Sequence, residues 1–454
     1  MQYGIIRGIH LLSQRLHLDT TSFVLHGRYD VEIAEGSPTP DYGYSKANRP
    51  DLKQVMLSLT QGGVANIPLW MEALDGNSSD KASFHATVRK VQEFTKHLHA
   101  VPDGLCFVVD AAFYVPEKLA ELNDVWWITR VPAQLKETKS WLKVPAETLS
   151  WHAFDENYRC VAQEGVIHGI KQRWLLIESK HALARELETF HRKLNRKAEV
   201  LGKALWHLSN QEFKCPTDAE HALKPLLKSL KYHQIHYEIV PIERYADKGR
   251  PKPGAQKIVI GYQIQGTFSS YLKKIKQEKQ SLGRFILATN QLDLGILDNH
   301  SILIQYKEQS CVESGFKFIK NKAFELESFY LKTPARIGAL MMVMTLCLMV
   351  YNFAQYHMRR CMEEHGDVLP NQVGKPITNP TMKWIAELMN MIAVVTIITD
   401  GKRHRIVTNV KKVHQRIIVY FGKHALDIYD LPNDLVHVEI NHANYKNILH
   451  WCEK

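Results

Sequence analysis

The stretch LCFVVDA, Leu105–Ala111, gives the strongest indication of the fold class. It is short and almost entirely apolar, which is typical of a strand buried on both faces of a sheet. A second run of this kind, VWWITRV, covers Val125–Val131, and a third apolar run, RFILATN, covers Arg284–Asn290. Buried strands of this kind need helices on their faces, so the chain is predicted to have an α/β core.

The residues before this stretch predict the rest of the sheet. His17–Leu25 is rich in β-branched and aromatic residues and is predicted to be a strand. Val55–Leu59 and Asn66–Ala73 are predicted to form a hairpin through Gly62-Gly63. A helix is expected from Asp80 to about Leu98, with Asp80 as its N-cap. The result is a mixed sheet covered by helices.

The character of the chain changes after about Leu135. A β-like patch is followed by a long basic helix over about Ala182–Leu208, which either lines a DNA channel or presents a solvated face. Because Arg284–Asn290 resumes the buried-strand pattern, this region is predicted to be an α+β insertion into the core. The expected segments are core 1–134, insertion domain 135–280, core 281–366 and a C-terminal region 367–454.

The composition of the chain indicates the class of molecule that the protein binds. The 454 residues are 45% hydrophobic, with a formal net charge of +11 and a pI near 9.1, which favours a polyanion such as nucleic acid. The seven cysteines are scattered, which predicts reduced thiols in a cytosolic protein, and no signal peptide is expected. Zinc-site spacings and phosphate loops of the Walker type do not occur in the sequence.

One run, Ile337–Ala354, is apolar enough to be considered as a membrane-spanning helix. Its 18 residues barely reach the roughly 17 to 25 that span a bilayer, and no other run resembles it. We expect a fully buried core helix and no membrane partner. A membrane-anchored protein is the alternative.

Asp19 and Asp110 each lie inside a predicted strand. A carboxylate among apolar strand residues costs on the order of several kcal/mol unless it is paired or binds a cation. Two such strands in one sheet therefore suggest a shared metal ion. The alternative is that each aspartate caps a turn at a strand end.

A third carboxylate occurs in YKEQSCVESGFKFIK, Tyr306–Lys320, which is predicted to be one helix. One polar arc of that helix, roughly 80° wide, holds Tyr306, Gln309, Glu313, Lys317 and Lys320. The adjacent stripe is apolar and is expected to pack on the sheet: Val312, Phe316 and Ile319. Glu313 would then lie at the edge of the packed face, where it could meet Asp19 and Asp110, unless the arc is an ordinary solvated face.

Three carboxylates from two strands and a helix can hold two divalent cations for phosphodiester displacement. Oxygen ligands favour Mg²⁺ or Mn²⁺ over zinc. In this interpretation the metal ligands and catalytic residues are Asp19, Asp110 and Glu313, and two ions bind per site. Lys317 and Lys320 would face a DNA phosphate.

These residues resemble the catalytic core of DDE transposases of bacterial insertion sequences, in the group with a Tyr-x2-Arg-x3-Glu-x6-Lys helix signature. The signature here is Tyr306, Gln309, Glu313 and Lys320, with Gln in place of Arg. Similar motifs are LDTTSF around Asp19, GYSKANRPDLKQ at 43–54, FVVDAAF around Asp110 and LPNQVGKPITNPT at 369–381. The resemblance covers nearly the whole chain.

The resemblance implies a ribonuclease-H-like mixed sheet with the insertion domain before the catalytic helix. It implies cut-and-paste DNA transposition by metal-dependent cleavage and strand transfer, by a homodimer or higher multimer on the DNA of a bacterial cytoplasm. By the same resemblance Tyr306 and Lys320 contact DNA, and Gln309 weakens a phosphate contact. Only 18 residues precede Asp19, so the N-terminal DNA-recognition domain of relatives is expected to be missing. A catalytically silent DNA-binding remnant, or an inhibitor of a full-length transposase, is the alternative.

Overall fold

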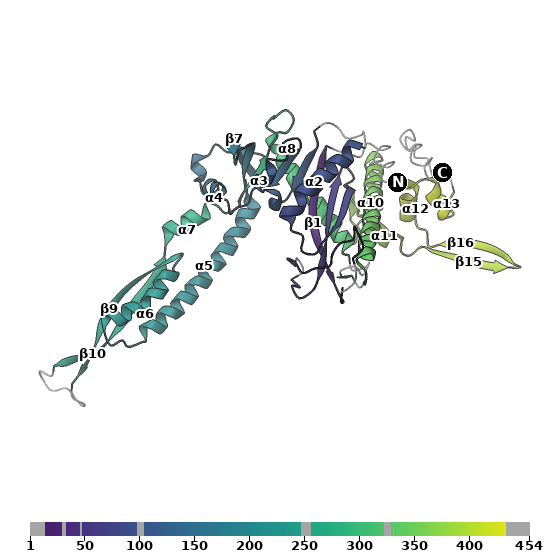
Figure 1. The fold of residues 1–454 in the computed structure, drawn as a ribbon. Coiled ribbons are helices and arrows are strands. Elements are labelled where there is room, and N and C mark those ends of the chain that lie inside the picture. Colours follow the sequence, from purple (N-terminus) through teal and green to yellow (C-terminus); the bar gives the residue numbers. More distant parts are fainter. Residues whose placement is uncertain are drawn as a thin grey trace. The chain divides into compact units, whose positions relative to one another are not determined.

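The fold is taken from a computed structural model, which describes residues 14–29, 33–45, 48–97, 104–246, 256–321, 328–329 and 331–432. The chain divides into two compact units (Figure 1). Unit 1 comprises Met1–Arg130, Val166–Gln172 and Thr289–Lys454. Unit 2 comprises Val131–Gly165 and Arg173–Ala288. The C-terminal region, predicted as a separate segment, therefore clusters with the core.

Unit 1 contains a mixed sheet with the strand order β3-β2-β1-β4-β5. The strands are β1 Arg15–Leu25, β2 Gln54–Gly62, β3 Ile67–Leu74, β4 Cys106–Val109 and β5 Trp126–Arg130. β1 pairs antiparallel with β2 and parallel with β4, and β4 pairs parallel with β5. The short strand β12, Ser328–Phe329, also pairs with β1. The strands predicted in this region are confirmed, including the β2–β3 hairpin.

Helices cover both faces of β1. Successive strand residues point to opposite faces, and two neighbouring threonines of β1 show this directly. Thr20 donates to Asp80 at the start of α2, Asp80–His97, whereas Thr21 accepts from Lys320 at the end of α9, Ser310–Ile319. α2 and α9 therefore lie on opposite faces, and Asp19, two residues before Thr21, shares the α9 face.

The α9 face holds a large apolar core. The predicted stripe of α9 is fully or almost fully buried there, together with β1, β2 and α10, Pro334–Glu364. Members of this core include Phe23, Leu57, Val312, Phe316, Ile319, Ile337, Met341 and Leu348. Gly315 allows the close approach, because a Cβ at that position would lie 3.0 Å from both Gln61 and Leu348.

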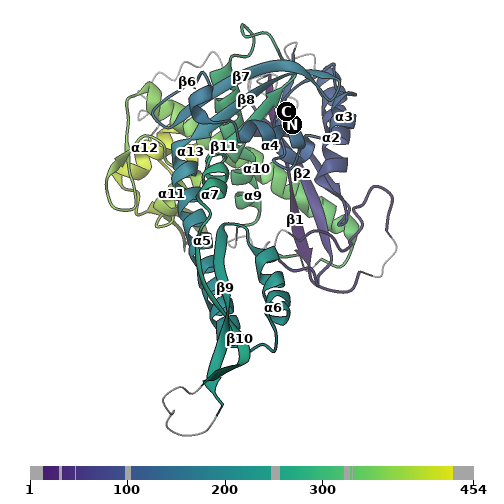
Figure 2. The same ribbon diagram turned by 90° about the vertical axis from the view of Figure 1, so that its left-hand side faces the viewer.

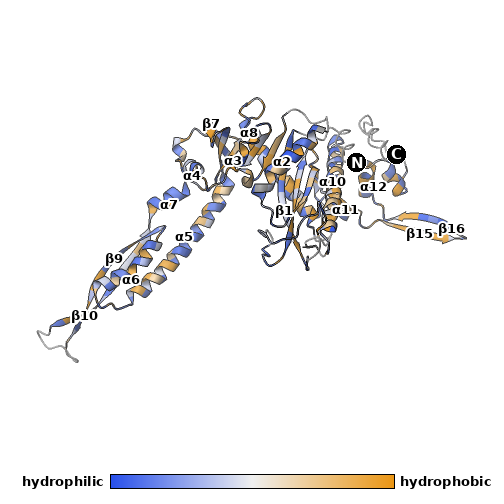
Figure 3. Cartoon of the chain, viewed as in Figure 1, coloured by the Kyte–Doolittle hydropathy of each residue, from blue (hydrophilic) through white to orange (hydrophobic). Residues whose placement is uncertain are grey.

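The prediction that the apolar run of α10 is buried on all sides is wrong. One face packs on the sheet, but Met342, Val343, Leu346 and Val350 are between 38% and 61% exposed. Figure 3 shows hydrophobic colouring along α10. Among the helices that the structure describes, α10 alone has the length and hydropathy to cross a membrane, and a core helix of a soluble protein passes the same test. In 342–350, apolar residues at spacings of three and four lie on both sides of the helix. The core covers one side, so the apolar residues on the other side are exposed.

The C-terminal region packs against the end of α10. Its elements are β13 Leu369–Pro370, β14 Pro376–Ile377, α11 Met382–Met389, β15 Ala393–Thr399, β16 Lys402–Thr408, α12 Lys412–Tyr420 and α13 Lys423–Ile428. β15 and β16 form an exposed hairpin whose turn residues, Asp400 and Gly401, both have positive φ. Positive φ at both positions is the mark of a type I′ turn, which matches the twist of a two-stranded ribbon.

Unit 2 overlaps the range 135–280, for which an α+β insertion domain is predicted. Its helices are α4 Lys136–Leu142, α5 Lys180–Ser209, α6 Pro216–Ser229 and α7 Leu272–Lys279. Its strands are β6 His152–Ala153, β7 Tyr158–Ile167, β8 Ile170–Ser179, β9 His233–Tyr245, β10 Lys257–Ser270 and β11 Arg284–Thr289. The first residues of β8 cluster with unit 1. α5 and α6 pack along the β9–β10 hairpin (Figure 2).

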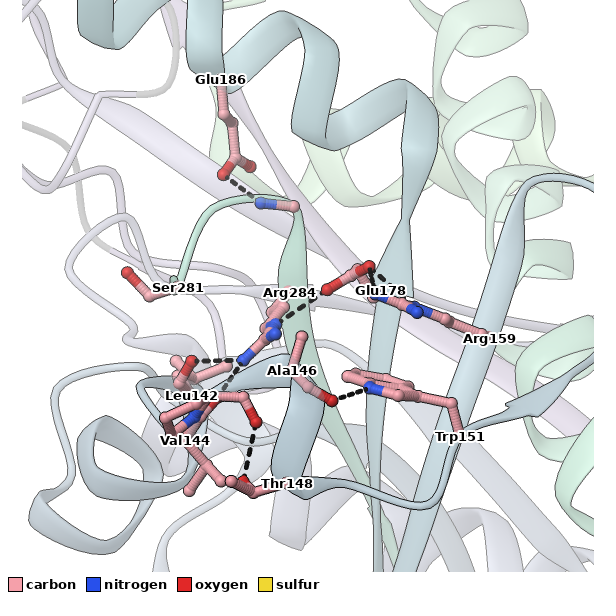
Figure 4. Close-up of polar contacts among 12 residues, drawn as sticks. Leu142, Val144, Ala146, Thr148, Trp151, Arg159, Glu178, Glu186, Ser281 and Arg284 are labelled. Carbon is pink, nitrogen blue, oxygen red and sulfur yellow. Dashed lines mark hydrogen bonds and ion pairs between the residues drawn. The ribbon is translucent and has the colours of Figure 1, made fainter. Parts of the chain in front are cut away.

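A buried arginine fixes the start of β11 (Figure 4). The side chain of Arg284 is only 3% exposed, and its Nε lies 2.9 Å from the Glu178 carboxylate on β8. Its Nη1 donates to the carbonyls of Leu142 and Val144 at 3.2 and 2.6 Å. Glu178 also pairs with Arg159, whose side chain is 43% exposed. Because a buried charge needs a partner, these contacts hold β11, which leads back into the core.

Candidate active site

The two predicted catalytic aspartates lie side by side. In the parallel β1–β4 pair, Leu18 is opposite Val109. Asp19 and Asp110 are the next residue of each strand, and adjacent strands lie about 4.8 Å apart. Asp110 keeps an extended backbone, with φ −71° and ψ 179°, so its side chain continues the strand pattern. Two half-buried carboxylates therefore meet at the carboxyl end of β4.

Asp110 is held in place by its neighbours. Its carboxylate accepts a hydrogen bond of 2.8 Å from the Ala112 N–H, as the N-cap of the short helix η1, Ala111–Phe113. The hydroxyl of Thr129, which is fully buried, donates to the Asp110 carbonyl at 2.7 Å. The turn-capping role that the sequence left open is thus real for Asp110, which is also the neighbour of Asp19 on the adjacent strand.

Arg130 joins this pair and was not predicted from the sequence. In the parallel β4–β5 pair, Val109 is opposite Thr129, so Arg130, the last residue of β5, is level with Asp110, the first residue after β4. The signal was present in the sequence, because Arg130 is a charged residue directly after a buried strand core. Parallel strands bring such residues to one edge of a sheet.

Tyr306 lies near these three charged groups. It belongs to α8, Asn299–Glu308, and its pKa is raised above the usual value, chiefly by burial. The Arg130 guanidinium opposes that shift in the pKa, while the Asp110 and Asp19 carboxylates add to it. A phenol with a raised pKa stays protonated at neutral pH and can donate a hydrogen bond to an oxyanion.

The single predicted helix over Tyr306–Lys320 is wrong. It is interrupted at Gln309, where α8 ends and α9 begins. The backbone angles of Gln309, φ −55° and ψ −22°, are those of a 3₁₀ turn, and its N–H donates to the Tyr306 carbonyl at 3.3 Å. Tyr306 and Glu313 therefore lie on different helices, and the continuous polar arc does not exist.

Two residues of the predicted signature bind the backbone and side chains of β1. The buried Gln309 donates from Nε2 to the Leu18 carbonyl at 3.2 Å. The Lys320 ammonium donates to Thr21 Oγ1 at 2.7 Å and to the Ser22 carbonyl at 2.6 Å. In this structure both side chains attach α9 to β1, and the DNA contacts predicted for them stay predictions.

Glu313 and Lys317 are exposed on α9. The two residues are four positions apart, so they lie on the same side of α9. Among the described residues, however, no group of three or more His, Cys, Asp or Glu side chains is placed to hold a metal ion. Glu313 is thus not grouped with the two aspartates in the part of the chain that the structure describes.

The donor set of Asp19 and Asp110 still fits Mg²⁺. This ion is commonly bound through one or two carboxylates and completes its shell with water and substrate phosphate oxygens. Asp110 uses one carboxylate oxygen for the Ala112 N–H, which leaves further acceptor capacity on the carboxylate. The Asp19 carboxylate likewise accepts from the Thr20 N–H at 2.7 Å, and the remaining oxygens of both side chains are ligands of the kind that one such ion takes.

Replacing Lys320 by Met tests its observed role. Thr21 and Ser22 would lose a charged donor, so we expect the free energy of unfolding to fall by about 1.5 to 3 kcal/mol. Lys317→Met, at an exposed position on the same helix, should change it by less than about 0.5 kcal/mol. Urea unfolding of the two variants checks this. Equal stabilities with weaker DNA binding by Lys320→Met would instead support the predicted DNA contact.

Comparisons with known proteins bear on this geometry. A family model described as a transposase DDE domain matches residues 13–352, a range that includes Asp19, Asp110 and Glu313. No curated protein matches the chain. A similar solved structure is a piggyBac transposase synaptic complex with hairpin DNA, at 10% identity and a TM-score of 0.33. The match covers 78% of this chain and 49% of that one, so this chain spans about half of that protein's length. Because the family model covers most of its length, the chain belongs to the DDE transposase family.

Proposed function

We propose that this chain is a DNA transposase that cleaves the ends of its element and joins them to target DNA, by a cut-and-paste route. The observation that carries the proposal is that the register of three adjacent parallel strands brings Asp19, Asp110 and Arg130 level with one another, with Tyr306 close enough for all three charges to act on it. Two carboxylates beside an arginine and a phenol suit a phosphodiester, because opposite charges are needed to hold a cation and an anionic phosphate together.

Each residue has a distinct task in this proposal. Asp19 and Asp110, with Glu313, would hold two Mg²⁺ or Mn²⁺ ions. Such ions activate a water or a 3′-hydroxyl for attack and stabilise the leaving oxygen. Arg130 and the protonated Tyr306 would donate hydrogen bonds to the non-bridging oxygens of the scissile phosphate. Lys317, exposed on α9, would contact the neighbouring backbone. Gln309 and Lys320 would contribute by holding α9 against β1.

The partners in this proposal are double-stranded DNA, both element ends and target, and further copies of the same chain that hold the two ends together. The protein would act in the bacterial cytoplasm, on the nucleoid.

One specific observation favours a second candidate function. Because Glu313 is not grouped with the aspartates, the chain could be a catalytically silent remnant that binds DNA without cutting it.

Metal-dependent nicking separates the two candidates. The full chain is incubated with short duplexes that bear the ends of the element encoding it, with Mn²⁺ or Mg²⁺ and then with excess EDTA. The transposase proposal expects cleavage that EDTA stops and that Glu313→Gln reduces at least about 100-fold. Glu308→Gln, an exposed glutamate on α8, should cleave like wild type. DNA binding without cleavage by the wild type would support the remnant.

A further inference from the structure

A cluster of lysines surrounds one buried tyrosine in unit 2. Tyr232 lies between α6 and β9, is 1% exposed and packs edge-on against Phe190 of α5 at 5.4 Å. Three ammonium groups lie near its ring centroid, those of Lys193 at 5.9 Å, Lys197 at 5.8 Å and Lys231 at 5.1 Å. Lys193 and Lys197 are four residues apart on α5, so they lie on the same side of the helix.

A cavity of about 520 Å³ opens beside this cluster. Its lining contains the basic residues Lys231, His233 and Lys274, together with Gln234 and Tyr271 and the apolar side chains of Leu227, Leu230 and Ile235. Burial and the charge of Lys197 both lower the pKa of His233, so Lys197 acts on a residue of the cavity wall. Tyr232 raises the pKa of Lys231, and Glu278, whose carboxylate lies 3.7 Å from the Lys231 ammonium, adds to that shift.

The side chains named around this cavity carry more positive than negative charge. Four lysines come from α5, the α6–β9 connection and α7, and Glu278 is the acidic partner that the structure pairs with Lys231. A cation over an aromatic ring gains little free energy at an exposed site. Repulsion between neighbouring ammonium groups opposes that gain. An anion with several acceptor oxygens would relieve the repulsion and bind several lysines at once.

We propose that Lys193, Lys197, Lys231 and Lys274 form a phosphate-binding site that holds the DNA backbone on unit 2. The ligand is a run of phosphodiesters in double-stranded DNA, and this assignment rests on the proposed function. Tyr232 would act as a rigid platform, because the ring is buried and three of the ammonium groups lie 5.1 to 5.9 Å from its centroid. The alternative source of the same chemistry is a free phosphate or mononucleotide.

The salt dependence of DNA binding tests this site without requiring catalysis. Binding of the full chain to a fluorescent duplex is measured by anisotropy between about 50 and 200 mM salt. Each lost lysine–phosphate contact should reduce the slope of log K against log salt by about one. Lys193→Gln/Lys197→Gln should therefore reduce the slope by about two and weaken binding at least about tenfold near 100 mM salt.

Lys180→Gln/Lys203→Gln is the matched control, because it removes two exposed charges from α5 away from Tyr232. Its slope should stay within about 0.5 of wild type. An equal change in both double variants, or no change in either, would overturn the site. A wild type that binds no duplex would instead overturn the proposed function.

A second arm distinguishes the source of the phosphate. Inorganic phosphate is added in a thermal-unfolding experiment with the wild type and with Lys193→Gln/Lys197→Gln. The DNA assignment expects at most a small, equal shift in Tm for both proteins. If phosphate raises the Tm of the wild type alone while the DNA slope is the same for both, the site binds free phosphate and the DNA assignment is wrong.

Discussion

Replacement of Asp110 by Asn is expected to reduce metal-dependent DNA cleavage at least about 1000-fold, because a loss of several kcal/mol of transition-state stabilisation corresponds to that factor. The amide keeps the shape of the side chain and its oxygen can still accept from the Ala112 N–H, as a good N-cap does. What it loses is the negative charge that the pair with Asp19 needs to hold a cation. The fold should therefore survive while the chemistry does not.

Asp298→Asn is the control for this change. Asp298 is the exposed N-cap of α8 and accepts from the Ser301 N–H at 2.9 Å, so the same chemical replacement is made at a similar structural position. It should cleave within about twofold of wild type, since a surface change of this kind is worth less than about 0.5 kcal/mol. Initial rates of nicking on one duplex compare the three proteins. Equal losses in both variants would place Asp110 outside the chemistry.

The second large effect is on stability. Arg284→Ala would leave the Glu178 carboxylate, 12% exposed, without its buried partner and would free two carbonyls. Breaking a buried pair from one side costs about 3 to 5 kcal/mol. Hydrogen exchange followed by mass spectrometry should therefore show faster exchange in the peptides that contain β8 and β11.

Arg159→Ala removes the other partner of the same carboxylate. Because Arg159 is 43% exposed, its loss should cost no more than about 1 kcal/mol. The two variants thus differ in burial but share Glu178 as the partner. If Arg159→Ala destabilises β8 and β11 as much as Arg284→Ala does, the buried contacts of Arg284 are not what fixes the start of β11.

The strands and the aspartate pair could be predicted from the sequence because their signals are local. An apolar run with one carboxylate, as in LCFVVDA, is visible in a few residues, and parallel pairing then brings Asp19 and Asp110 together without further information. The apolar stripe of Val312, Phe316 and Ile319 was visible for the same reason. Each of these features depends on the spacing of residues within a single strand or helix.

The features that were missed depend on contacts between elements. Helical propensity runs through Gln309 without a break, but its amide reaches the Leu18 carbonyl and the chain makes a 3₁₀ turn there. Lys320 was assigned to DNA because a lysine on a polar arc looks solvated, whereas Thr21 and Ser22 provide acceptors almost 300 residues away in sequence. Arg130 becomes meaningful only once the register of β4 and β5 is known.

The most direct test of the site is the binding of Mn²⁺, followed by electron paramagnetic resonance, to the wild-type chain and to Asp19→Asn, Asp110→Asn and Asp298→Asn. If Asp19 and Asp110 together hold the ion, each of their variants should lose affinity at least about tenfold, since even residues outside the first ligand shell have effects of that size. Asp298→Asn should bind like the wild type. Equal Mn²⁺ affinity in all four proteins would contradict the assignment of the aspartate pair as the metal site of this chain.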